Sequence, residues 1–179
     1  MKIFKINLAL LLASVMALSV GCGEEAPTHN VENPSMALNE LSITDTNGVD
    51  KRSISTGDAF KVSWQADASG LVDNLYKFAF YISDSPTVST DPLTEELTKL
   101  FDVDCRTGGS LYRECSSTGE ATCELKLLQG SLIYSCVLSE GSVTPKTRSL
   151  KYSGTVYAIG KACVYDLCDE KSITLSVFN

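Results

Sequence analysis

Apolar and polar residues alternate along much of the chain, with the period of a β-strand that has one buried face. Residues 59–66, AFKVSWQA, alternate in this way, and residues 75–83, LYKFAFYIS, do so again. Residues 153–178 read as two further strands joined by a short turn. The positions expected to face the core are Phe60, Val62, Trp64, Ala66, Phe78, Phe80 and Ile82.

One segment has helical spacing instead. In residues 93–101, LTEELTKLF, the leucines Leu93, Leu97 and Leu100 follow the i, i+4, i+7 pattern, so at most one short helix is expected. Several short strands with turn signals and almost no helix are typical of an all-β fold, and we expect a β-sandwich.

Four of these segments resemble strands of fibronectin type III and related immunoglobulin-like domains. FKVSWQADASG resembles the second strand, with Val62 and Trp64 in a Val-x-Trp pattern, and KFAFYIS resembles the third. TVYAIGKACV resembles the penultimate strand, with Tyr157 and Ile159 in a Tyr-x-aliphatic pattern, and KSITLSVF resembles the last. The resemblance implies an immunoglobulin/fibronectin type III-like β-sandwich.

The middle of the chain departs from this family. Residues 83–144 are more than the family needs and hold four cysteines, which indicates a cysteine-rich hairpin insertion. The cysteine pair that joins the second and penultimate strands of antibody domains is absent from the sequence. The resemblance therefore concerns architecture rather than activity.

The chain opens with a basic front and a short apolar run. The run from Leu8 to Val20 has 13 residues, whereas a membrane-spanning helix needs about 20, so a secretory signal is expected. The next residues complete LSVGC, Leu18–Cys22, which resembles the lipobox of bacterial type II signal peptides, with Ser19 where the family more often has leucine. The alternatives are a secreted protein with a free Cys22 and an uncleaved anchor.

The lipobox resemblance implies a domain organisation. Residues 1–21 would be removed as the signal peptide, Cys22 would be acylated, residues 22–36 would form a flexible tether, and residues 37–179 would fold as the β-sandwich domain. Three acyl chains hold a protein on a membrane far more firmly than one. Gly23, where retention at the inner membrane would favour aspartate, implies an outer membrane lipoprotein of the cell envelope, on its periplasmic or surface face.

The net charge of the mature chain limits the classes of partner that it can bind. Removal of Lys2 and Lys5 takes two of 15 basic side chains, so 13 face 22 acidic ones, a net charge of −9. Nucleic acid and anionic lipid head groups would be repelled, and neither is expected as a partner.

Six cysteines remain besides Cys22, and an even count in an exported chain predicts three disulfides. A hairpin that turns at Gln129–Gly130 places Cys123 opposite Cys136 at a non-hydrogen-bonded position, where the Cα separation suits a disulfide. A second hairpin that turns at Tyr165–Asp166 pairs its own two cysteines, and the remaining two pair by elimination. The predicted bridges are Cys105–Cys115, Cys123–Cys136 and Cys163–Cys168.

The sequence offers few candidate catalytic residues. His29 is the only histidine and lies in the expected tether, which argues against His-dependent nucleophiles. Paired carboxylates remain as candidates for a hydrolase, although surface acids are usually solvated. These pairs are Glu95–Glu96, Asp102–Asp104 and Asp169–Glu170.

Metal sites also have weak support. The sequence lacks the closely spaced ligand pairs of structural zinc sites, so no metal and no cofactor are predicted. DTNGVD, Asp45–Asp50, offers oxygens to calcium, but its order differs from that of a calcium-binding EF-hand loop. Asn47–Gly48 is instead a strong turn signal, and a turn is the expected structure there.

The turn of the last hairpin is the predicted contact surface. Tyr165, Asp166 and Leu167 would lie on a loop stiffened by a disulfide, and a rigid loop with an aromatic side chain loses little entropy on binding. The sequence thus favours a membrane-anchored, non-catalytic envelope lipoprotein that acts as a binding or structural module for a protein or glycan. The alternative is an envelope enzyme inhibitor or a carboxylate-dependent hydrolase.

Overall fold

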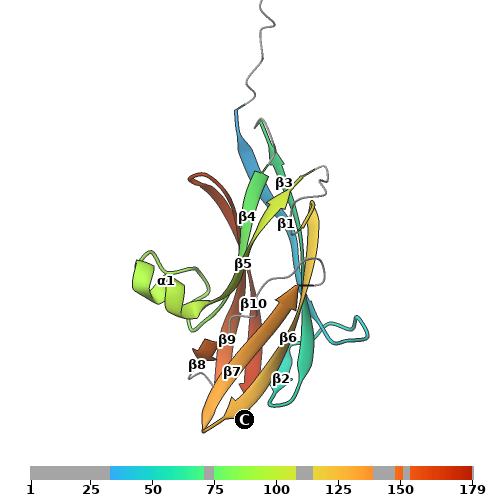
Figure 1. Cartoon of the computed structure of the whole chain (residues 1–179), viewed down its shortest axis with the longest axis vertical. Coiled ribbons are helices and arrows are strands. Elements are labelled where there is room, and N and C mark those ends of the chain that lie inside the picture. The colour runs from blue at the N-terminus through green and yellow to red at the C-terminus, as the bar shows by residue number, and fades with distance from the viewer. Residues whose placement is uncertain (1–32, 71–74, 108–114, 139–147, 151–153, 179) are drawn as a thin grey trace, which may run out of the picture. The chain divides into compact units, whose positions relative to one another are not determined.

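Strands account for most of the described chain. The computed structural model describes residues 33–70, 75–107, 115–138, 148–150 and 154–178. The first five-stranded sheet contains, in spatial order, β1 (Ser35–Thr44), β3 (Ala59–Ser69), β6 (Thr118–Leu128), β7 (Ser131–Leu138) and β8 (Arg148–Leu150). The second contains β2 (Ser53–Ser55), β10 (Leu167–Phe178), β9 (Gly154–Val164), β4 (Leu75–Ser83) and β5 (Lys99–Arg106). Figure 1 labels these strands. Within the sheets β2 and β10 run parallel and the other neighbours antiparallel.

The main hydrophobic core draws side chains from both sheets. The seven core positions expected from the sequence are all buried in it. At its centre the ring of Trp64 on β3 stacks on that of Phe78 on β4, with centroids 4.1 Å apart and planes 4° apart. The strand alternation read from the sequence is therefore confirmed for β3 and for this face of β4.

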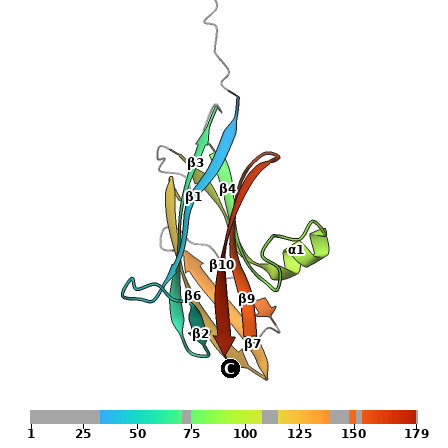
Figure 2. The same cartoon turned by 180° about the vertical axis from the view of Figure 1, so that it is seen from behind.

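The other face of β4 is buried as well, which the sequence did not indicate. Ala79 and Tyr81 pack with Val88 and Ile159 in a second, smaller cluster. Val88 belongs to the segment between β4 and β5, and Figure 2 shows that this segment, with α1, stands beside the second sheet. Burial on both faces explains why β4 reads as a nearly continuous apolar run from Phe78 onward.

The helix is shorter than its leucine spacing implied. α1 covers Pro92–Thr98, and the Asp91 carboxylate caps it by accepting a hydrogen bond from the Thr94 backbone amide at 2.9 Å. Leu93 and Leu97 are exposed, and Leu100 is buried in β5 rather than in the helix. The i, i+4, i+7 pattern thus correctly indicated a helix but placed its end and its apolar face incorrectly.

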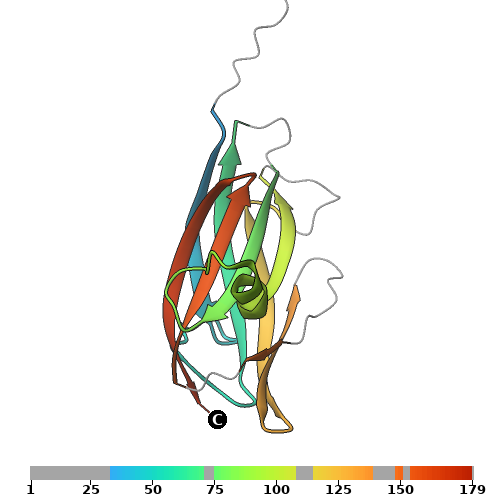
Figure 3. The same ribbon diagram turned by 90° about the vertical axis from the view of Figure 1, so that its left-hand side faces the viewer.

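Two ends of the fold can be told apart (Figure 3). At one end, β1 begins at Ser35, and the Leu38 amide donates to Asp169 Oδ2 at 2.8 Å, close to the β9–β10 turn. At the other end, the Thr56 amide donates to the Phe178 carbonyl at 3.2 Å, near the β6–β7 turn. These are called the Ser35 end and the Phe178 end below.

Candidate functional site

The β9–β10 turn has the geometry that the sequence predicted. Cys163 faces Cys168 in the register, their Cα atoms lie 4.1 Å apart and they form a disulfide. Tyr165 and Asp166 form the turn beyond this bridge, at the Ser35 end. The Tyr165 side chain is 85% exposed and that of Leu167 is 44% exposed, so the two present apolar surface to the solvent.

Tyr165 also has an uncommon backbone conformation. Its φ is +50°, in the left-handed region that hairpin turns usually fill with glycine or asparagine. A glycine would adopt this angle without steric cost, whereas tyrosine adopts it at some expense of stability. Gln129 in the β6–β7 turn has the same φ, so this backbone conformation is shared by both hairpin turns.

The other cysteines pair as the sequence predicted. Cys123 and Cys136 face each other across β6 and β7 with Cα atoms 4.0 Å apart, and Cys105 and Cys115 lie 4.6 Å apart. Between β6 and β7, Gln129 and Gly130 have φ values of +50° and +80°, as the type I′ turn requires. The predicted register of this hairpin is confirmed at each pair from Leu128–Ser131 to Cys123–Cys136.

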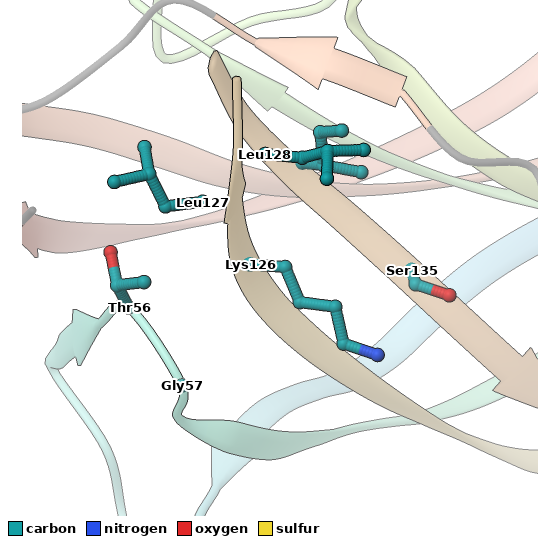
Figure 4. A pocket seen from close by; sticks show the side chains of 7 residues that line it. Thr56, Gly57, Lys126, Leu127, Leu128 and Ser135 are labelled. Carbon is teal, nitrogen blue, oxygen red and sulfur yellow. The ribbon is translucent and has the colours of Figure 1, made fainter. Parts of the chain in front are cut away.

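The Phe178 end carries a groove that the sequence did not predict. Its volume is about 390 Å³, and it lies between the β2–β3 turn and the β6–β7 hairpin (Figure 4). Leu127 and Leu128 contribute apolar surface and are 51% and 59% exposed. One weak indication of this apolar surface is present in the sequence: in LKLL, residues 125–128, the alternation of the hairpin ends in two consecutive leucines. The groove is lined by Thr56, Gly57, Lys126, Leu127, Leu128, Ile133 and Ser135.

Lys161 lies between the carboxylates of Glu95 and Glu170. Lys161 Nζ lies 4.0 Å from Glu95 Oε1 and 3.5 Å from Glu170 Oε1. Glu95 also accepts a hydrogen bond from the Tyr81 hydroxyl at 2.9 Å, and Glu170 accepts one from the Val88 amide at 3.3 Å. Burial raises the pKa of Tyr81 far above its usual value, and the bond to Glu95 raises it further. These contacts tie the α1 segment to the second sheet.

The three pairs of adjacent acids differ in how the fold places them. Asp169 accepts the Leu38 amide on β1, whereas Glu170, its neighbour on β10, points to Lys161 and the α1 segment. Glu96 forms a salt bridge with Lys99 at 2.8 Å, and Lys99 Nζ also lies 3.9 Å from Asp102. Asp102 forms a salt bridge with Lys77 at 3.3 Å, and Asp104 lies two residues farther along β5, on the same face of the strand.

The loop at Asp45 is a turn, as expected. Asp45 Oδ1 accepts the backbone amides of Asn47 and Val49 at 2.8 and 2.9 Å, and Gly48 has φ of +84°. The hydrogen bond from Val49, followed by that from Asn47, lowers the pKa of Asp45 below its usual value despite some desolvation. Asp45 Oδ1 therefore holds the turn together through two backbone bonds.

Cys22, His29 and the predicted signal peptide lie outside the described residues, and β1 begins two residues before the expected domain start at Ala37. Within the described ranges, no helix is long and apolar enough to cross a membrane. In the same ranges, no group of three or more His, Cys, Asp or Glu side chains could hold a metal ion. Comparisons with protein-family models, curated proteins and solved structures found no match.

Proposed function

We propose that this chain is a lipid-anchored protein of the bacterial cell envelope that acts as a non-catalytic binding module. The anchor rests on the resemblance of LSVGC to a lipobox, with Cys22 as the acylated residue. The observation that carries the binding role is the groove at the Phe178 end, where Leu127 and Leu128 are exposed beside one another. Apolar side chains beside a groove are typical of surfaces that bind a partner.

The fold proposed for this module is an immunoglobulin/fibronectin type III-like sandwich. Immunoglobulin-like domains place their last, penultimate and third strands side by side, and β10, β9 and β4 are neighbours in the second sheet. The Trp64–Phe78 stack between β3 and β4 supports the packing of the two sheets against each other.

The middle of the chain differs from that pattern. In the immunoglobulin order A-B-E-D, the later strand of the D–E pair lies beside the second strand. Here the earlier strand, β6, lies beside β3, and β7 follows it outward. Tyr157 and Ile159 pack in the cluster near the α1 segment instead of the main core. The β5–β8 part is therefore this chain's own elaboration.

The contacts of the acids favour binding over hydrolysis. A glycosidase needs two carboxylates with space between them for a glycosidic oxygen or a water molecule. Between Glu95 and Glu170 that space holds the Lys161 ammonium, and both carboxylates accept further hydrogen bonds. This arrangement supports a structural role for the pair.

The groove can be tested in cells by photo-cross-linking. A photoreactive phenylalanine analogue at Leu128 should give an adduct of one defined mass, because a partner would cover this position. The control is the same substitution at Val137, which is 51% exposed on the same sheet. Mass spectrometry of the purified chain should find an acylated Cys22 at the N-terminus. Equal adducts at both positions would contradict the binding surface, and an intact Met1 would contradict the anchor.

A further inference from the structure

We propose that the β9–β10 turn, Tyr165 and Asp166, together with Leu167 at the start of β10, contacts the lipid surface to which the chain is anchored. The inference rests on the anchor of the proposed function and is independent of the partner at the groove. The surface that the exposed Tyr165 side chain contacts is the interface of a lipid bilayer with little net charge.

The position of the turn relative to the start of β1 is the first argument. β1 and β10 run side by side in the same direction, and the Leu38 amide bonds to Asp169 at 2.8 Å. Ser35 lies three residues before Leu38, and Asp166 lies three residues before Asp169. The chain therefore enters the fold at the end that carries the turn (Figure 1).

The length of chain between anchor and fold is the second argument. Cys22 and Ser35 are separated by 13 peptide steps, so a flexible chain would span about 20 Å on average and at most about 45 Å. β10 itself is 12 residues long, so the Phe178 end lies roughly 35 Å beyond the Ser35 end. The turn therefore lies at the end of the fold where the chain from the anchor enters, and the groove lies at the opposite end.

The chemistry of the turn suits the boundary between lipid and water. Tyrosine is enriched there because its ring is apolar and its hydroxyl remains hydrated. Leu167, the first residue of β10, adds an exposed aliphatic side chain, and the Cys163–Cys168 bridge limits the entropy that contact would cost. A tether of this length gives the turn a millimolar effective concentration at the surface, so weak contact is sufficient.

The charges near the turn determine which lipid surface fits. Asp166 is in the turn itself, and Asp169 and Glu170 follow it on β10, while Lys161 and Lys171 are the nearby cations on β9 and β10. Asp169 is held by the Leu38 amide, and Glu170 is paired with Lys161. The balance is acidic, so anionic head groups should weaken the contact and zwitterionic phosphatidylcholine should suit it.

Depth-dependent quenching of tryptophan fluorescence tests the proposal. The full-length acylated chain with Tyr165→Trp is incorporated into phosphatidylcholine vesicles that contain brominated lipid. Gln129→Trp is the matched control, because Gln129 is also a hairpin-turn residue with φ of +50° but lies at the Phe178 end. Trp64 is buried in the core and gives a constant background in both variants.

The outcomes separate this proposal from the proposed function. We expect at least twofold quenching of Tyr165→Trp, none of Gln129→Trp, and less quenching of Tyr165→Trp when anionic lipid is added. If both variants float with vesicles but neither is quenched, the anchor stands and the contact with lipid is refuted. If emission of Tyr165→Trp responds only to added envelope protein, the turn binds protein and the proposal is overturned. If acylated Cys22 is absent by mass spectrometry, both proposals fail.

Discussion

Two glycines determine how closely the aromatic rings at the centre of the core can pack. Gly119 lies opposite Trp64 in the β3–β6 register, and a Cβ atom there would overlap the indole ring. Gly160 on β9 would place a Cβ atom 3.0 Å from both Phe78 and Leu41. The stacked pair of Trp64 and Phe78 thus needs one glycine, a residue without a side chain, in each sheet. Glycine, usually a weak strand residue, is required here for packing.

Gly119→Ala should therefore lower the free energy of unfolding by about 1–3 kcal/mol, the usual cost of overpacking a core. Gly160→Ala should cost less, because its Cβ atom would lie 3.0 Å from its nearest neighbours, Leu41 and Phe78, and so needs a smaller shift than the direct overlap with Trp64 at Gly119. Denaturant titration of both variants measures the difference. A Gly119→Ala protein as stable as the wild type would show that the indole ring does not lie against β6.

At the scale of elements, the hairpins were the most predictable part of the fold. In β6–β7, the cysteines, the apolar alternation and the turn at Gln129–Gly130 all required one register, and a shift by one residue would have violated all three. The site was less predictable, because the groove and the Lys161 contacts join residues far apart in sequence. Leu100 shows the same limit, since β5 rather than helical spacing decides its environment.

The disulfides of the two hairpins should differ in their contribution to stability. Cys123–Cys136 closes a sequence separation of 13 and Cys163–Cys168 one of 5, so the chain-entropy estimates are about 3 and about 2 kcal/mol. The Cys123/Cys136→Ala double variant should lose more than its estimate, because both side chains are also buried in the core.

Unfolding of the two double variants in denaturant, compared with the wild type, checks this order. The Cys163/Cys168→Ala variant should also keep the rest of its fold, because its bridge lies next to an exposed turn. A larger loss from this variant than from the Cys123/Cys136→Ala variant would contradict the account.

At the scale of the whole molecule, buried tyrosines set an alkaline limit to stability. Burial raises the pKa of Tyr76 to about 12 and that of Tyr134 to about 12, from an ordinary value of 10. Between pH 10 and 12 the unfolded chain loses these protons while the folded chain keeps them. The stabilisation is complete below pH 10 and is lost as the pH rises through 12, on the order of 2 kcal/mol for each tyrosine.

Tyr134→Phe and Tyr76→Phe should both reduce this alkaline loss, but they should differ at pH 8. The Tyr134 hydroxyl is buried without a hydrogen-bond partner among the described residues, so its removal should leave stability unchanged or raise it. The Tyr76 hydroxyl donates to the Ser116 carbonyl at 2.6 Å, and its removal should cost about 1 kcal/mol. Free energies of unfolding at pH 8 and pH 11 measure both effects. Equal losses at pH 8 would refute the distinction.

The pairing of β1 with β3 has a mechanical consequence for a protein held at one end. β1 follows the proposed tether directly and pairs with β3 over nearly its whole length, from Ser35 to Thr44. In the proposed arrangement, a partner at the groove that pulled against the membrane anchor would load β1 along its length. The backbone hydrogen bonds between β1 and β3 then share the force at once, in shear, instead of opening one after another from a loose end. The first strand would thus serve as a tension-bearing joint between the bilayer and whatever the module holds.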